Sequence, residues 1–341
     1  MLTAGSLFAG IGGICLGFSE AGFEVKWANE IDEDACRTYE HNSRLVGKDV
    51  LVVDEDIQHF YPDLLVHIDV LTAGFPCQPY SLAGNMKGLE DSRAKPMFEA
   101  LVEQAVMLDV RAIFMENVPT LLTMDDGEVL NTYEQMLREA GYPYLWKHIY
   151  STSEYGGVAQ MRKRLYMVAF KDCKEYSIFT LKAEEEMTPC PITRGFYEII
   201  DVDHPVADRY YYNDKKMLRF KRDVEPVVTE VGKFYQYRRN KTRAFDSNDP
   251  PLCPTLTASM GIGGHNVPLI RDSKGIRKLT PKECVLFQGF PEDFEFPAGM
   301  GDNTAYKQAG NSVSVPVIAR IAKILRKSLE ESETTASGPS I

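Results

Sequence analysis

Strand-like apolar runs alternate with helix-like segments over the first 170 residues or so of the chain, and this alternation limits the fold more than any other feature. The strand-like runs lie at 2–10, 25–31, 50–57, 68–76, 112–118, 144–151 and 164–170. Helix-like stretches, such as the amphipathic 131–142, separate most of them. Strands that alternate with helices are typical of an open, mostly parallel sheet, so we predict an α/β fold.

The character of the chain changes after about residue 172, where the pattern becomes irregular and prolines increase. Between Arg209 and Arg243 there are eleven Lys and Arg against four Asp and Glu, a local charge of +7 in a chain whose net charge is −11. A basic island in an acidic protein is one mark of nucleic-acid binding, although a solvated charged surface has the same composition. We therefore expect a second domain here.

The cysteine pattern and the hydropathy of the chain exclude several classes of protein. The seven cysteines are scattered and include no C-x-x-C pair, so we expect neither a disulfide framework nor a metal site. Most of them should be small buried side chains. No apolar run reaches membrane-spanning length, and no basic N-terminal region precedes a long apolar core. We expect a cytoplasmic protein.

A glycine-rich loop, FAGIGG from Phe8 to Gly13, lies where the first strand gives way to a helix. Glycines there let the backbone approach a ligand, and the helix N-terminus offers free N–H groups. Glu30 follows Phe8 by 22 residues, and Asp56 closes the third strand-like run. An acidic residue about 20 positions on commonly binds ribose hydroxyls, so we predict an adenosine-containing cofactor. The loop lacks the third glycine of the dinucleotide fingerprint, which disfavours NAD and FAD.

A cysteine and a glutamate follow two later strand-like runs and should reach the same edge of the sheet. Cys77 lies in GFPCQPYS, and Glu116 lies in ENV. A thiol and a carboxyl on neighbouring loops beside a cofactor form a candidate catalytic pair. In QMRKR, Arg162 and Arg164 alternate, so an extended segment would present both on one side.

Together these motifs make the chain similar to the bacterial type of C5-cytosine DNA methyltransferases. SLFAGIGG, GFPCQPYS, DSR, ENV, QMRKR, RKLTPKECVLFQGFP and GNSV occur in the family's order and with near-family spacing, over about residues 1–170 and 277–325. The resemblance implies a Rossmann-like S-adenosylmethionine-dependent methyltransferase sheet with a smaller, irregular target-recognition domain. We place the catalytic and cofactor-binding domain at 1–185 plus 302–330, the recognition domain at 186–301 and a disordered polar tail at 331–341.

The resemblance also assigns the chemistry. Cys77 is the nucleophile that adds to carbon 6 of a flipped-out cytosine, after which carbon 5 takes the methyl group of S-adenosylmethionine. Glu116 meets N3 of the base and shares a proton with it. Arg164 contacts the cytosine O2, and Arg162 lies beside it near the thiol. S-adenosyl-L-homocysteine is the product of the cofactor.

The same resemblance supplies a cofactor pocket, in which Glu30 takes the ribose and Ile31 packs on the adenine. The predicted cofactor-binding residues are Phe8, Gly10, Ile11, Gly12, Gly13, Glu30, Ile31, Asp56, Ile57, Pro76, Asn311 and Ser312. The last two return from the far end of the chain to complete the pocket. Ser6 departs from the family, which commonly has an acidic residue there.

Duplex DNA is the predicted partner, and the loop after Cys77 is expected to close over it. The predicted DNA contacts are Gln78, Ser81, Arg93, Gln160, Arg238, Arg239, Arg243, Thr255 and Thr257. RKLTPKECVLFQGFP is interpreted as a packing motif that supports the recognition domain.

Two other functions remain open on this scaffold, a tRNA cytosine-C5 methyltransferase and a non-catalytic DNA-binding paralogue. The recognition region with PTLTASMG favours DNA, and the intact Cys77, Glu116 and Arg164 favour an enzyme. We expect a monomer without a membrane anchor. Enzymes of this kind commonly act in restriction–modification, so a cognate restriction endonuclease is a candidate partner that the chain does not physically require.

Overall fold

The computed structural model describes residues 1–47, 49–60, 66–76, 94–212, 222–238, 241–245, 250–261 and 266–336. The chain divides into two compact units. The first unit comprises Met1–Tyr150, Lys163–Pro189 and the chain from Val315 onward, and the second comprises Ser151–Arg162 and Cys190–Ser314.

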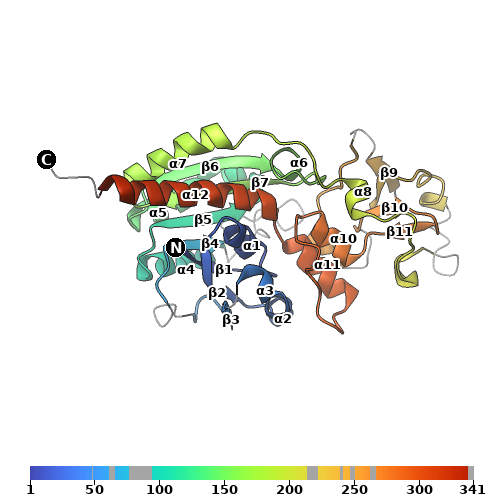
Figure 1. Ribbon diagram of the computed structural model, residues 1–341, viewed down its shortest axis with the longest axis horizontal. Helices are drawn as coiled ribbons and strands as arrows, with labels where there is room; N and C mark the ends of the chain where they lie inside the picture. The colour runs from blue at the N-terminus through green and yellow to red at the C-terminus, as the bar shows by residue number, and fades with distance from the viewer. Residues whose placement is uncertain are drawn as a thin grey trace. The chain divides into compact units, whose positions relative to one another are not determined.

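The first unit is built on a seven-stranded sheet with the order β3-β2-β1-β4-β5-β7-β6 (Figure 1). Its strands are β1 (Thr3–Leu7), β2 (Glu24–Glu30), β3 (Leu51–Asp54), β4 (Val70–Ala73), β5 (Ala112–Asn117), β6 (Tyr144–Ser151) and β7 (Lys163–Phe170). β1 to β5 pair in parallel, and β7 pairs antiparallel to β5. The predicted α/β fold with a mostly parallel sheet is confirmed.

Strand order reverses between β1 and β4, because the chain runs outward from β1 to β3 and then returns to the other side of β1. Parallel sheets bind ligands beyond the carboxyl ends of their strands at such a switch point. The loops that follow Leu7 and Ala73, two residues paired in register, therefore mark the place where the first unit can bind a ligand.

Helices cover both faces of the sheet, and β5 is buried along its whole length. The helices of this unit are α1 (Gly13–Glu20), α2 (Glu33–His41), α3 (Ser43–Val46), α4 (Ala94–Met107), α5 (Glu128–Glu139), α7 (Cys173–Glu186) and α12 (Val315–Ala336), with 3-10 turns η3 (Pro119–Leu122) and η4 (Met124–Gly127). Ile113 and Met115 join the core formed with α4 and α5. Phe114 faces the other way and packs edge-on against Phe18 of α1, as the period of a strand requires.

The last helix, α12, lies beside α1 and α7 over one face of the sheet (Figure 1). It continues to Ala336, so the expectation of a disordered tail from residue 331 is wrong for its first six residues. The reason is a polar contact at its end. Arg111, just before β5, donates to the carbonyl of Leu329 and to the side chains of Ser332 and Glu333.

The second unit contains a smaller sheet with the order β11-β10-β8-β9. Its elements are α6 (Thr152–Tyr155), α8 (Phe196–Ile199), η5 (Asp208–Tyr210), β8 (Phe234–Arg238), β9 (Lys241–Phe245), η6 (Ala258–Gly261), β10 (Leu269–Arg271), β11 (Ile276–Lys278), α10 (Pro281–Leu286) and α11 (Asp302–Asn311). Within the described residues, no helix of either unit is both long and apolar enough to span a membrane.

Two segments fall in the second unit although the sequence placed them in the catalytic domain, namely Ser151–Arg162 and Asp302–Ser314. Helix α11 packs so closely on η6 that a Cβ added at Gly310 would meet the carbonyl carbon of Thr257 at 2.1 Å. The N–H of Met161 donates to the carbonyl of Cys253 at 2.8 Å. Both contacts join residues that are far apart in the chain, so the sequence pattern did not reveal them.

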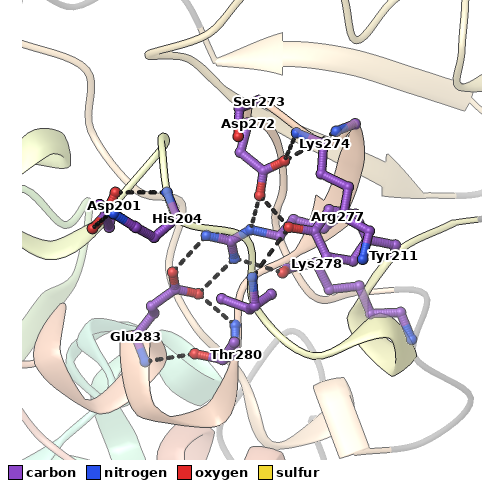
Figure 2. Close-up of polar contacts among 12 residues, drawn as sticks. Asp201, His204, Tyr211, Asp272, Ser273, Lys274, Arg277, Lys278, Thr280 and Glu283 are labelled. Carbon is purple, nitrogen blue, oxygen red and sulfur yellow. Dashed lines mark hydrogen bonds and ion pairs between the residues drawn. The ribbon is translucent and has the colours of Figure 1, made fainter.

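A buried ion network holds the small sheet to α10 (Figure 2). Arg277 on β11 has no exposed surface. Its Nε donates to Asp272 at 2.7 Å, and its two Nη atoms donate to the carboxylate of Glu283 at 2.8 and 2.7 Å. Glu283 also forms a capping box with Thr280 at the start of α10. The prediction that RKLTPKECVLFQGFP is a packing motif is confirmed.

The network extends through Asp272 to a tyrosine on the segment before the small sheet. One oxygen of Asp272 accepts the backbone N–H groups of Lys274 and Gly275, and the other accepts the hydroxyl of Tyr211 at 2.6 Å. Burial and this hydrogen bond to Asp272 raise the pKa of Tyr211 to about 12, so the hydroxyl remains a donor at neutral pH. Asp272 thus accepts hydrogen bonds both from the backbone of the β10–β11 turn and from the guanidinium of Arg277.

Candidate active site

The glycine loop after β1 adopts a strained, left-handed path. Phe8 has φ 53°, Gly10 has φ 56° and Gly12 has φ 88°. The ring of Tyr39 packs under Gly12, where an added Cβ would lie 2.9 Å from a ring carbon, whereas a Cβ at Gly10 would meet nothing within 4 Å. The Tyr39 ring therefore packs directly against the loop at Gly12, whereas there is free space beside Gly10. Gly13 then begins α1, and Ile11 is buried.

The carboxylate of Glu30 holds this loop against the end of β2. Its Oε2 accepts the N–H of Gly10 at 2.8 Å, and its Oε1 accepts the N–H groups of Ile31 and Asp32, both at 2.9 Å. Three backbone N–H groups thus converge on this one carboxylate. In this structure Glu30 therefore shapes the glycine loop, a role that the sequence did not indicate.

The other predicted pocket residues of the first unit differ in exposure. Ile31 directly follows Glu30 and is 63% exposed, which is unusual for an isoleucine and suits an apolar ligand surface. Asp56 is half-buried, and its side chain accepts the N–H of Gln58 at 3.0 Å. Ile57 is buried and packs into the core of the unit. Pro76 is half-buried at the end of the segment that follows β4.

Glu116 and Arg164 form an ion pair at the carboxyl end of β5. Glu116 lies opposite Tyr166 in the antiparallel register, which makes Arg164 its diagonal neighbour on the same face. The Nε of Arg164 lies 3.1 Å from Oε1 of Glu116, and both side chains are largely buried. The structure thus brings together the carboxyl and the guanidinium that were both predicted to contact the target cytosine.

Arg162 lies in the second unit, outside β7, because that strand begins at Lys163. Of the two arginines expected to alternate in one extended segment, β7 therefore includes only Arg164. The guanidinium of Arg162 is buried and donates to the carbonyls of Leu256, at 3.0 Å, and Ser312. In this structure it joins two loops of the second unit.

Gln160 is fully buried, and its Nε2 donates to the carbonyl of Phe287 at 2.7 Å. Its side chain has no exposed surface in this structure, and the predicted contact of Gln160 with DNA stays a prediction. In the sequence, a polar residue close to three basic ones has the composition of a surface segment. Its packing partner is 127 positions away.

The loop residues Thr255 and Thr257 are partly exposed and already have partners. The hydroxyl of Thr255 donates to the carbonyl of Met161, and that of Thr257 shares a hydrogen bond of 3.0 Å with Ser259. Asn311 is exposed at the last position of α11, whereas Ser312 is buried and caps that helix.

Of the three candidate DNA-reading arginines, Arg243 can be placed. It is exposed on β9, donates to Gln236 at 3.1 Å and lies over the ring of Phe245. Arg238 ends β8. The remaining predicted positions lie outside the described residues, namely Cys77, Gln78, Ser81, Arg93 and Arg239.

Four of the other cysteines are held as inert thiols, as expected from their scattered pattern. Cys15, Cys36, Cys253 and Cys284 are buried. Burial raises the pKa of each thiol, to about 12 in the case of Cys36. Because the thiolate is the nucleophilic form, none of these four suits covalent catalysis at neutral pH.

Comparison with known proteins gives consistent results. The model of the family described as "C-5 cytosine-specific DNA methylase" matches residues 2–327. The type II methyltransferase M.Bsp6I of Bacillus sp. (strain RFL6) is 40% identical over 96% of this chain and 100% of its own length. M.NlaX of Neisseria lactamica, also a type II methyltransferase, is 32% identical over 95% of this chain and 96% of its own length.

Among solved structures, a putative DNA modification methyltransferase encoded within a prophage of E. coli superposes with a TM-score of 0.64 at 22% identity. The match covers 97% of this chain and all of the other chain. At this identity the likeness concerns the fold, and it agrees with the mixed α/β architecture with a parallel-rich sheet.

Proposed function

The chain belongs to the C-5 cytosine-specific DNA methylase family, and from this we propose that it modifies one specific duplex site as the methyltransferase of a restriction–modification system. As a DNA cytosine-5 methyltransferase, it would take the methyl group from S-adenosylmethionine. The 40% identity to a type II methyltransferase, which is matched over its full length, supports the restriction–modification setting.

The ion pair of Glu116 and Arg164 is the observation that carries the proposal. The two side chains converge at the carboxyl end of β5, next to β4, and the chain that follows β4 leads through Pro76 to Cys77. A carboxyl suits N3 of a cytosine and a guanidinium suits its O2, so the pair offers both contacts that such a base needs on that edge. The pair is largely buried, which favours a flipped-out base over one inside a duplex.

Catalysis then rests on three side chains. The thiolate of Cys77 adds to carbon 6 and forms a C–S bond, while the π electron pair of the C5=C6 double bond is delocalised over carbon 5, carbon 4 and N3, with which Glu116 shares a proton. Carbon 5 thereby becomes nucleophilic. Arg164 holds the O2 side of the base and compensates the charge of Glu116. Loss of the carbon 5 proton and expulsion of the thiolate restore the aromatic ring after methylation.

The residues of the first unit fit the cofactor. Open space at Gly10, the exposed Ile31 and the carboxylate of Glu30 lie around the ends of β1 and β2, beside the switch point between β1 and β4. S-adenosylmethionine would supply an electrophilic methyl group there. Glu30, Ile31 and the backbone of the glycine loop would hold it, with Asp56 near the adenine.

Bisulfite sequencing of plasmid DNA from cells that express the chain tests the proposal. We expect complete protection of one cytosine within one recurring sequence. The purified Glu116→Gln variant should methylate a duplex with that sequence about 10²-fold more slowly, because an amide cannot share a proton with N3. Unmodified plasmid DNA, together with methyl transfer to tRNA, would overturn the proposal in favour of an RNA substrate.

The support under the glycine loop leads to a separate prediction about cofactor affinity. A Gly12→Ala change should weaken S-adenosylmethionine binding by about tenfold, because it adds left-handed strain and a clash with the ring of Tyr39. Isothermal titration calorimetry measures the effect.

Gly141→Ala is the matched control for this prediction. Gly141 has φ 90°, close to that of Gly12, but an added Cβ would meet nothing within 4 Å. It should therefore lose stability from strain alone and keep its cofactor affinity. Equal affinities of the two variants would show that the packing of Tyr39 under the loop has no role in binding.

A further inference from the structure

A buried asparagine joins the two strands that carry the reacting groups. Asn117 is the last residue of β5, directly after Glu116, and is 1% exposed. Its Nδ2 donates to the carbonyl of Phe75 at 3.2 Å, and its Oδ1 accepts the N–H of Val118 at 2.8 Å. One carboxamide therefore links the end of β5 to the segment that leaves β4.

The segment after β4 is held on its other side by aromatic packing. Phe75 is buried, with its ring edge-on to Phe98 of α4 at 5.5 Å and to Tyr133 of α5 at 6.2 Å. Phe98 and Tyr133 stack on each other at 3.9 Å. The ring of Phe75 thus fixes the side chain of this residue, and Asn117 fixes its carbonyl group.

This arrangement bears on the thiol because Phe75 precedes Cys77 by two residues. Two residues span at most about 7 Å, so a fixed carbonyl at Phe75 restricts where the thiol can lie. Neighbouring residues of a strand point to opposite faces. Glu116 accordingly pairs with Arg164 on one face of β5. Asn117 reaches the nucleophile segment from the other.

We propose that Asn117 is a positioning residue that sets the backbone before Cys77 in register with the carboxyl of Glu116. The inference rests on the proposed function and adds a residue to it. Catalytic groups need placement to within about 0.5 Å, and an error of about 1 Å can reduce a rate by about 10²-fold. A single strand end that determines both groups would provide that accuracy.

The Asn117→Asp variant tests the proposal most directly. Aspartate has the same shape and can still accept the N–H of Val118, but it cannot donate to the carbonyl of Phe75. We expect methyl transfer, and covalent trapping on a duplex with 5-fluorocytosine at the target, to slow by about 10- to 100-fold. The affinity for S-adenosylmethionine should change less than about twofold, since Asn117 has no part in the predicted pocket.

Tyr142→Phe is the control for a purely structural effect. The hydroxyl of Tyr142 is buried and donates to the carbonyls of Ala105 and Val110, both at 2.9 Å, before the start of β5. Removing it also breaks buried side chain–backbone hydrogen bonds in the first unit, but at the opposite end of that strand. We expect a comparable loss of thermal stability with an unchanged rate of methyl transfer.

The outcomes separate the inference from the function that it assumes. If the unaltered chain methylates DNA and Asn117→Asp traps 5-fluorocytosine at the same rate, Asn117 has only a structural role. Slowing by the same factor in Tyr142→Phe would also overturn the inference. If the unaltered chain neither methylates DNA nor forms the adduct, the proposed function itself fails.

Discussion

A Cys77→Ser variant is expected to lose methyl transfer by at least about 10⁴-fold while it still binds S-adenosylmethionine. A serine hydroxyl is almost never ionised at neutral pH, so the attack on carbon 6 loses its nucleophile. The glycine loop, Glu30 and Ile31 are untouched by the change, so the cofactor should bind as before. Methyl transfer from labelled S-adenosylmethionine and calorimetric binding measure the two properties.

The matched control is Cys173→Ser, which makes the same chemical change at an exposed cysteine of α7. This variant should methylate DNA at the normal rate. A duplex carrying 5-fluorocytosine should form a stable adduct with the unaltered chain and with Cys173→Ser, because fluorine cannot leave carbon 5 as a proton does. An adduct with Cys77→Ser would assign the nucleophile to another residue.

An Arg277→Met variant is expected to destabilise the second unit by about 3–5 kcal/mol. The loss arises because Asp272 and Glu283 would remain as two buried carboxylates without their shared cation. Methionine fills a similar volume, so little of the effect comes from a cavity. Native-state hydrogen exchange at the amides of β10, β11 and α10 measures it, since these elements surround the guanidinium.

Arg243→Met tests whether the loss of any arginine from the unit has the same effect. Arg243 is exposed and donates to a neutral side chain, so its replacement should change the free energy of unfolding by less than about 1 kcal/mol. If the two variants lost equal stability, the buried network would contribute no more than a surface contact. Replacing Arg277, Asp272 and Glu283 together by apolar residues should recover much of the stability, because no charge is then buried alone.

The sequence predicted the sheet well because buried parallel strands leave a strong local signal. The runs before Glu30 and around Glu116 are apolar and end in polar residues, and both proved to be strands whose ends carry predicted site residues. For the side chain of Ile57 the local pattern was ambiguous, because an apolar residue beside a carboxylate can face a ligand or the core. It belongs to a core that includes residues of α4 and α5, which the local pattern does not describe.

Contacts between distant segments explain what the sequence could not predict. Asp272, Arg277 and Glu283 each resemble ordinary surface charges in the printed sequence, and only the fold brings them together without water. The same is true of Gln160, whose partner is the carbonyl of Phe287, and of Gly310, whose missing Cβ lets α11 approach Thr257. For Asn117 a signal existed, since a second polar residue at the end of an apolar strand is uncommon without a partner.

The division of the chain into discontinuous units has a consequence for engineering. The backbone passes between the units after Tyr150, Arg162, Pro189 and Ser314, so the second unit is not one continuous insertion. A chimera that exchanged only Cys190–Ser314 with a relative would leave behind Gln160 and Arg162, whose side chains bond to Phe287, Leu256 and Ser312. Exchanging the second unit between two such enzymes therefore requires the short Ser151–Arg162 segment to be transferred together with the larger piece.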